Sequence, residues 1–136
     1  MHAEPVGTTT ASMIAHIPPG ADQPLTYWAS VGSPCLSAFV PLYVDADVPA
    51  VLSSGGEHPS DDSPWWLAKR ILTFVEAGWP RRAPQVREEL DEFEARVAAQ
   101  MERERVAAKS AAERTAFMHA TVDDWVACLR RLAQRL

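Results

Sequence analysis

Apolar and polar residues alternate along three short segments in the first third of the chain. Residues 8–17, 25–31 and 36–44 each show a period of two, which is typical of β-strands that present two different faces. Prolines and glycines at 18–20 and 32–34 separate these segments, and such short connections favour an antiparallel meander. Because Pro41 has no N–H to donate, we expect the third strand to be bulged or to lie at a sheet edge.

A helical period of three to four residues follows from residue 63 onward. Ser63 is a good N-cap with Pro64 at the first helical position, and Gly78 followed by Pro80 predicts a left-handed end to this helix. Its apolar stripe consists of Leu67, Ile71, Phe74 and Val75.

Two further helices are predicted in the last third of the chain. One begins near Pro84, and a final helix begins at Thr121, with Asp124 completing a weak capping box. The Ala-rich sequence between them favours helix, but the pattern leaves open whether residues 107–120 run straight or bend. The two apolar stripes are Val86, Leu90, Phe93, Val97 and Met101, and then Val122, Trp125, Val126, Leu129, Leu132, Ala133 and Leu136.

Together these patterns predict an α+β fold in which packed helices cover one face of an antiparallel three-strand meander. The 136 residues, 47% of them hydrophobic, suit a single domain, whole or partial, with strands in 8–45 and helices in 63–136. All 11 prolines and all 6 glycines lie at or before Pro84, which agrees with this division.

Charge is distributed unevenly along the chain. Residues 1–62 carry seven acids and no Lys or Arg, so the formal charge of -5 is the sum of an acidic front and a slightly basic back. An acidic protein argues against a nucleic-acid partner, and no segment is apolar for the length of a membrane span. The first residues lack the basic and apolar regions of a secretory signal, so we expect a cytoplasmic protein without membrane partners.

Residues suited to catalysis or metal binding are scattered. The four histidines show no metal-ligand spacing, and Cys35 and Cys128 are far apart, so packed, reduced thiols are favoured. We therefore predict no catalytic residue, no cofactor and no metal site. Thr9, Thr10, Ser12 and His16, which line the first predicted strand, are the candidates for a pocket, although threonine also simply favours strands.

The order of several short motifs resembles the secernin and dipeptidase family of cysteine N-terminal-nucleophile hydrolases. Met1-His2 precedes a Thr9-Thr10-Ala11-Ser12 strand, a second strand ends in Gly32-Ser33-Pro34, and Ser37 to Val44 matches the motif Ser-x-Phe-x-Pro-aliphatic-aromatic-Val. The helix at Arg87 to Glu94 is comparable with an acidic helix of that family. The resemblance covers almost all of this chain but only the C-terminal part of a family member.

The resemblance implies the C-terminal part of an αββα sandwich and hydrolysis of dipeptides or small amides. The family's nucleophile is a cysteine at a new N-terminus, whose α-amino group acts as the base. Here His2 occupies the second position, and Cys35 and Cys128 lie elsewhere, so no catalytic residue carries over and we expect the chain to be inactive alone. Met1 also corresponds to the family's internal Met-His, which favours an internal methionine taken as a start.

Three roles follow from these observations. The first is a segment or subunit of such a peptidase, whose partner is the missing N-terminal half in the same longer chain or a separate subunit. The second is a non-catalytic interaction domain that forms a homo-oligomer. The third is a small binding protein that uses the sheet and Trp65-Trp66. An isolated half of a sandwich should expose the edge of the first strand, which is an aggregation hazard unless a partner covers it.

Overall fold

The computed structural model describes residues 2–3, 7–20 and 23–135, with no side-chain description at 2–3. Strands β3 (Ala11–His16), β4 (Thr26–Val31) and β5 (Val40–Tyr43) form an antiparallel sheet in that order. Strands β1 (His2–Ala3) and β2 (Gly7–Thr8) form a separate two-stranded ribbon. The predicted antiparallel three-strand meander followed by helices is confirmed.

The register of the sheet fixes which residues share a face. Met13 pairs with Ala29 and Ala29 with Val40, whereas Ile14 pairs with Trp28 and Trp28 with Pro41. β5 is an edge strand of the sheet formed by the described residues, as Pro41 predicts.

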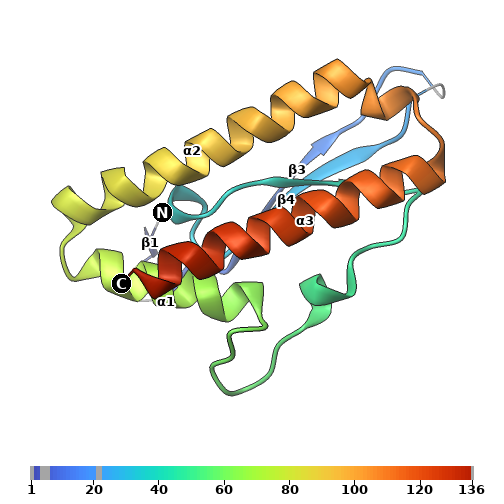
Figure 1. Ribbon diagram of the computed structural model, residues 1–136. Helices are drawn as coiled ribbons and strands as arrows, with labels where there is room; N and C mark the ends of the chain where they lie inside the picture. Colours follow the sequence, from blue (N-terminus) through green and yellow to red (C-terminus); the bar gives the residue numbers. More distant parts are fainter. Residues whose placement is uncertain (1, 4–6, 21–22, 136) are drawn as a thin grey trace.

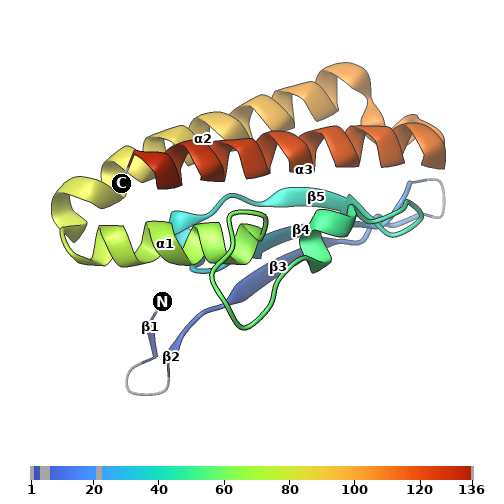
Figure 2. The ribbon, with the colours of Figure 1, turned by 60° about the horizontal axis from the view of Figure 1, so that its bottom comes forward.

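Three helices follow the sheet. They are α1 (Pro64–Glu76), α2 (Trp79–Glu104) and α3 (Ala111–Gln134), with short 3-10 turns η1 (Pro34–Leu36), η2 (Ala50–Ser53) and η3 (Val106–Ala108). α2 and α3 run side by side on one side of the sheet (Figures 1 and 2), and α3 packs on both β5 and α1. Helices α2 and α3 therefore form a layer over the sheet, and α1 lies below them beside the end of the sheet (Figure 2).

The core lies between α3, the other two helices and β5. The predicted stripe of α2 is buried at Val86, Leu90, Phe93 and Val97, and Met101 packs against its edge. On α3, Trp125 and Leu129 are fully buried, while the predicted Leu136 lies outside the described residues. Helical periodicity thus identified the buried faces correctly.

Several predicted boundaries were wrong. The predicted strand 8–17 is interrupted at Thr9 and Thr10, and the segment 36–39 is a 3-10 turn and coil before β5. Gly78 has φ -169°, which is extended and not left-handed, and α2 begins directly after it, so Pro84 lies inside this helix.

The beginning of α3 also differs from the prediction. Ser110 accepts a hydrogen bond from the Glu113 N–H, and the Glu113 carboxylate accepts one from the Ser110 N–H, which forms a complete capping box. Arg105 ends α2 in the left-handed conformation, so the Ala-rich segment bends. Thr121, the predicted start, is a buried residue within α3.

Candidate functional site

The four predicted pocket residues lie along the first edge of the sheet and do not converge. Thr9 and Thr10 precede β3, Ser12 is its second residue, and His16 is its last. Six residues of extended chain span about 20 Å, so Thr10 and His16 lie at opposite ends of the strand. The structure therefore offers two separate places for a site.

The threonine end holds only a small cavity. A space of about 40 Å³ is lined by Thr8, Thr9, Thr10, Gly32, Trp65 and Lys69, among others. Such a volume has room for a water molecule but not for an organic substrate. We therefore expect these threonine hydroxyl groups to support the local structure and not to bind a substrate.

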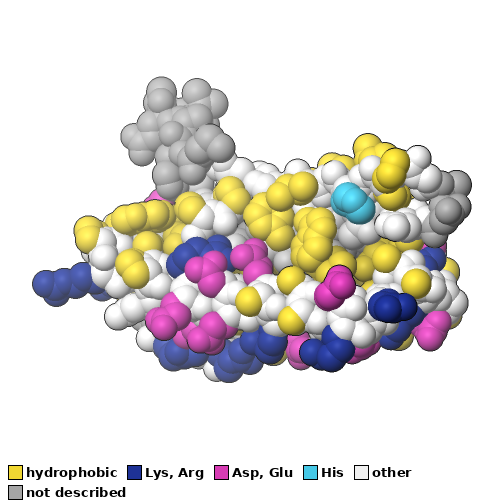
Figure 3. Space-filling view, turned by 90° about the horizontal axis from the view of Figure 1, so that it is seen from above, with side chains coloured by type: hydrophobic (Ala, Val, Ile, Leu, Met, Phe, Trp, Pro, Cys, Tyr) yellow, Lys and Arg dark blue, Asp and Glu magenta, His cyan; other side chains and the backbone are white. Residues whose placement is uncertain are grey.

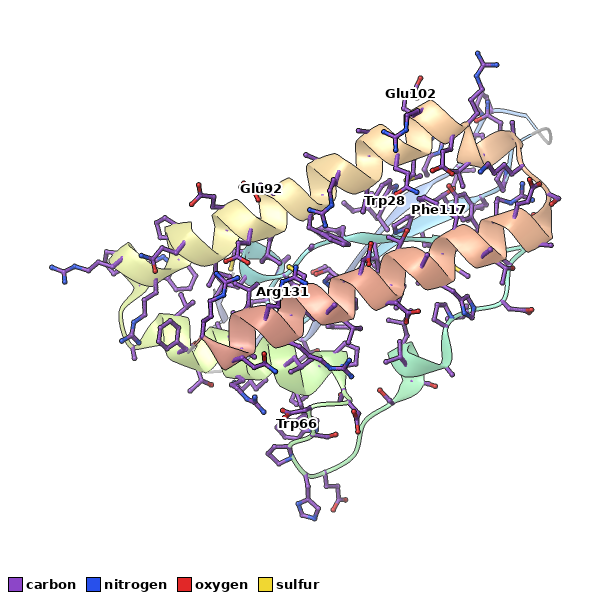
Figure 4. The ribbon with its side chains drawn as sticks, viewed as in Figure 1. Trp28, Trp66, Glu92, Glu102, Phe117 and Arg131 are labelled. Carbon is purple, nitrogen blue, oxygen red and sulfur yellow. The ribbon has the colours of Figure 1, made fainter. Side chains whose placement is uncertain are left out.

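The His16 end opens into a larger cleft between the sheet and the end of α2. The cleft has a volume of about 490 Å³ and is lined by His16, Trp28, Tyr43, Met101, Glu102 and Arg105, among others. Figure 4 shows Trp28 on the sheet, behind the space between α2 and α3. This volume is typical of small-molecule pockets, which span roughly 300–1,000 Å³.

Arg105 stands at this cleft in an unusual conformation. Its φ of 49° makes it the one non-glycine residue of the described chain with positive φ. Left-handed backbone costs a side-chain-bearing residue about 1–2 kcal/mol, so the surrounding structure must hold it there. The Arg105 N–H caps α2 by donating to the Glu102 and Met101 carbonyls.

An ion pair between the buried Arg114 and the exposed Asp45, next to the cleft, was not predicted from the sequence. The Arg114 guanidinium binds the Asp45 carboxylate and donates to the Lys109 carbonyl. The hydrogen bond from Arg114 holds the pKa of Asp45 below its ordinary value of 3.8. Burial raises the pKa of Tyr43, whose ring lies 5.9 Å from the Arg114 guanidinium carbon. These contacts join the end of β5 to the first turn of α3.

The two cysteines do not form a nucleophilic site. Cys128 is buried on α3, and burial raises the pKa of its thiol, which disfavours the reactive thiolate. Cys35 is half-buried in η1. Within the described residues, neither thiol makes a hydrogen bond to a base, and no cluster of His, Cys, Asp and Glu side chains could hold a metal ion.

β3 leaves an apolar surface open on both sides. Met13 is 66% exposed and Ile17 72% on one face, and Ile14 is 56% exposed on the other. In register with Met13 lie Ala29, which is half-buried, and Val40, which is buried in the core, so the exposed part of this uncharged face is β3 itself. Figure 3 shows a band of hydrophobic side chains and a histidine beside a charged strip of the surface.

The outer edge of β3 also has free backbone groups. The Gly32 N–H donates to the Thr10 carbonyl, so backbone groups of Thr10, Ser12 and Ile14 point toward β4. Those of Ala11, Met13 and Ala15 consequently point away from the sheet. No other strand among the described residues pairs with this edge.

Comparisons with known protein families, curated proteins and solved structures give no match. None of the helices in the described residues combines the length and the apolar composition needed to cross a membrane.

Proposed function

We propose that this chain is the C-terminal segment or subunit of a secernin-like N-terminal-nucleophile peptidase, and that it is inactive until the nucleophile-bearing half joins it. The observation that carries the proposal is β3, which has exposed apolar side chains on both faces and whose outer edge pairs with no strand of the described residues. The motif resemblance described above supplies the family.

The open face of the sheet supports this role. In an αββα sandwich, each sheet has helices on one face and a second sheet on the other. Helices α2 and α3 lie on one side here, while Met13 and Ile17 are exposed and no helix of the described residues covers β3 on their side (Figure 2). A second sheet packed on this face would bury these side chains.

The free edge of β3 would add a strand from the same partner. Outward N–H and C=O groups at Ala11, Met13 and Ala15 can pair with an antiparallel strand. β3 contains no Lys, Pro or bulge, which are the devices that usually protect an edge from pairing. An edge strand that pairs with a partner strand does not need these features.

The partner would supply the chemistry. A cysteine with a free α-amino group on the other half would cleave dipeptides or small amides in the cytoplasm, and this half would provide sheet and helical support. The chain brings no cofactor, nucleic-acid or membrane partner to this scheme.

A homo-oligomer is the alternative, favoured by one observation. Because the outward groups are centred on Met13, a second copy can pair in antiparallel fashion with Met13 opposite Met13 and Ala11 opposite Ala15, without any charged residue in the ladder. This arrangement would make the chain a non-catalytic interaction domain.

The deciding experiment is an intact-mass and hydrogen-exchange measurement on the protein purified from its native source. A larger chain, or a copurifying polypeptide that begins with cysteine, together with slow exchange at the Ala11, Met13 and Ala15 amides, is the expected result. A free chain of 15.0 kDa whose Met13 amide exchanges rapidly would overturn the proposal. A homodimer of 15.0 kDa chains with a protected Met13 amide would establish the alternative.

A further inference from the structure

The cleft between the sheet and the end of α2 is separate from the face on which a second sheet would pack. His16, Trp28 and Tyr43 line it from the helix side of the sheet, and Met101 lines it from α2. Met13 belongs to the opposite face, because it alternates with Ile14 and His16 along β3. A ligand in this cleft is therefore independent of the proposed assembly.

The inner walls of the cleft are apolar and aromatic. The half-buried Trp28 offers an indole ring, and Met101 offers a thioether beside it, with Ala98 and Ala108 completing the wall. Aromatic ligands stack on indole rings and make favourable contacts with methionine sulfur. The walls thus suit a planar ring system.

The polar side chains of the cleft include one cation, Arg105, and several groups that can both donate and accept a hydrogen bond. The Tyr43 hydroxyl is buried without a hydrogen-bond partner among the described residues, and Tyr43 lies at the cleft. His16 and Arg105 likewise form no side-chain hydrogen bond or ion pair within the part of the chain that the structure describes. By contrast, the neighbouring Arg114 and Lys109 are each paired with a carboxylate.

We propose that this cleft binds a planar aromatic carboxylate. The ring lies against Trp28 and Met101, and the carboxylate binds the Arg105 guanidinium at the cleft mouth. A guanidinium matches a carboxylate through two parallel hydrogen bonds, and the left-handed backbone of Arg105 fixes where this side chain leaves the helix. Glu102, the carboxylate that also lines the cleft, opposes such a ligand and sets a limit on its affinity.

Isothermal titration calorimetry of the full chain with 2-naphthoate and its neutral amide tests the proposal. We expect 2-naphthoate to bind at least about tenfold more tightly than the amide, since hydrogen bonds to charged groups are stronger than those between neutral groups. Arg105→Gln should weaken naphthoate binding by about tenfold, and Glu102→Gln should strengthen it. Arg103→Gln, an exposed arginine outside the cleft on the same helix end, is the matched control and should bind like the unmodified chain.

Three results would overturn the proposal. They are no binding of naphthoate by the unmodified chain, equal affinity for naphthoate and the amide, and equal affinity of the Arg105→Gln and Arg103→Gln variants. A nuclear magnetic resonance titration of the unmodified chain adds a readout that does not depend on folded variants. Naphthoate should shift the indole N–H resonance of Trp28, and a Trp28 resonance that does not move at saturation would place the ligand elsewhere.

Discussion

At the scale of single residues, the contact between Asp45 and Arg114 couples folding to pH. Arg114 lowers the pKa of Asp45 in the folded chain below the ordinary value of 3.8. The ionised carboxylate therefore stabilises the fold fully at pH values above this ordinary pKa. That contribution is lost as the pH falls through the lowered folded-state value.

The prediction concerns Asp45→Asn. The unmodified chain should be more stable than the variant near neutral pH, and the difference should shrink as the pH falls from about 6 to about 2. Urea unfolding followed by circular dichroism measures both proteins. Asp47→Asn, which removes an exposed carboxylate from the same loop, controls for the loss of one negative charge. A stability difference between the unmodified chain and Asp45→Asn that is constant with pH would exclude a role for this ion pair.

Glu94 joins α2 to the loop before β5. Its carboxylate accepts hydrogen bonds from the Phe39 N–H at 2.8 Å and from Arg87 at 2.9 Å, and Arg87 donates to the Ser37 carbonyl at 2.9 Å. Glu94→Ala leaves the partly buried Phe39 N–H without its acceptor and removes one of the acceptors of Arg87, and should lower the free energy of unfolding by about 1–2 kcal/mol. Chemical denaturation measures this change. Glu92→Ala removes an exposed carboxylate two residues away (Figure 4) and should change stability by less than about 0.5 kcal/mol, and equal losses in the two variants would contradict the assignment.

These contacts between distant residues could not be predicted from the sequence. Phe39 and Glu94 are 55 positions apart, and Asp45 and Arg114 are 69 apart. Their partnership depends on how the elements pack, which no local pattern contains. Buried positions such as Leu90 and Leu129 were predictable because helical periodicity directly records which side of a helix is buried.

At the scale of elements, two serines at helix starts behave differently. Ser110 caps α3 with its side chain, and its hydrogen bonds lower the pKa of Glu113. Ser63 stands at the N-cap of α1, but its hydroxyl is buried and makes no cap hydrogen bond. Sequence alone favoured Ser63 as a cap and passed over Ser110.

Substituting each serine by alanine separates the two roles. Ser110→Ala should destabilise the chain by about 1 kcal/mol, because the Glu113 N–H loses its side-chain acceptor and the Glu113 carboxylate loses the Ser110 hydroxyl as a donor. Ser63→Ala should be close to neutral, because it removes a buried hydroxyl that has no partner among the described residues. Thermal or urea unfolding compares them, and a larger loss for Ser63→Ala would show that this residue caps α1 in solution.

Strand faces were harder to predict than helix faces. Alternation along β3 groups Ala11, Met13, Ala15 and Ile17, but this apolar face is open, while Ser12, Ile14 and His16 point to the helix side. Alternation tells which residues share a face and not which face the chain itself covers. The candidate site could not be predicted in this way, because Thr9 and Thr10 lie before the start of β3 and His16 lies at its end.

At the scale of the whole molecule, the apolar side chains on the helix side are buried, whereas several on and beside β3 are exposed. The interface between α3 and β5 is fully packed, whereas β3 contributes exposed apolar side chains and free backbone groups. Edges of this kind usually associate with another strand. The chain should therefore self-associate in solution.

Met13→Lys tests this expectation. A lysine on β3 places a positive charge on the open face and beside the free edge, so neighbouring copies would repel each other. Sedimentation velocity over a range of concentrations should show concentration-dependent association of the unmodified chain and a monomeric Met13→Lys variant. Val48→Lys, at a position 58% exposed but outside the sheet, is the matched control and should associate like the unmodified chain. If the unmodified chain stays monomeric at all concentrations, or if Val48→Lys abolishes association as fully as Met13→Lys, β3 is not the surface through which copies meet.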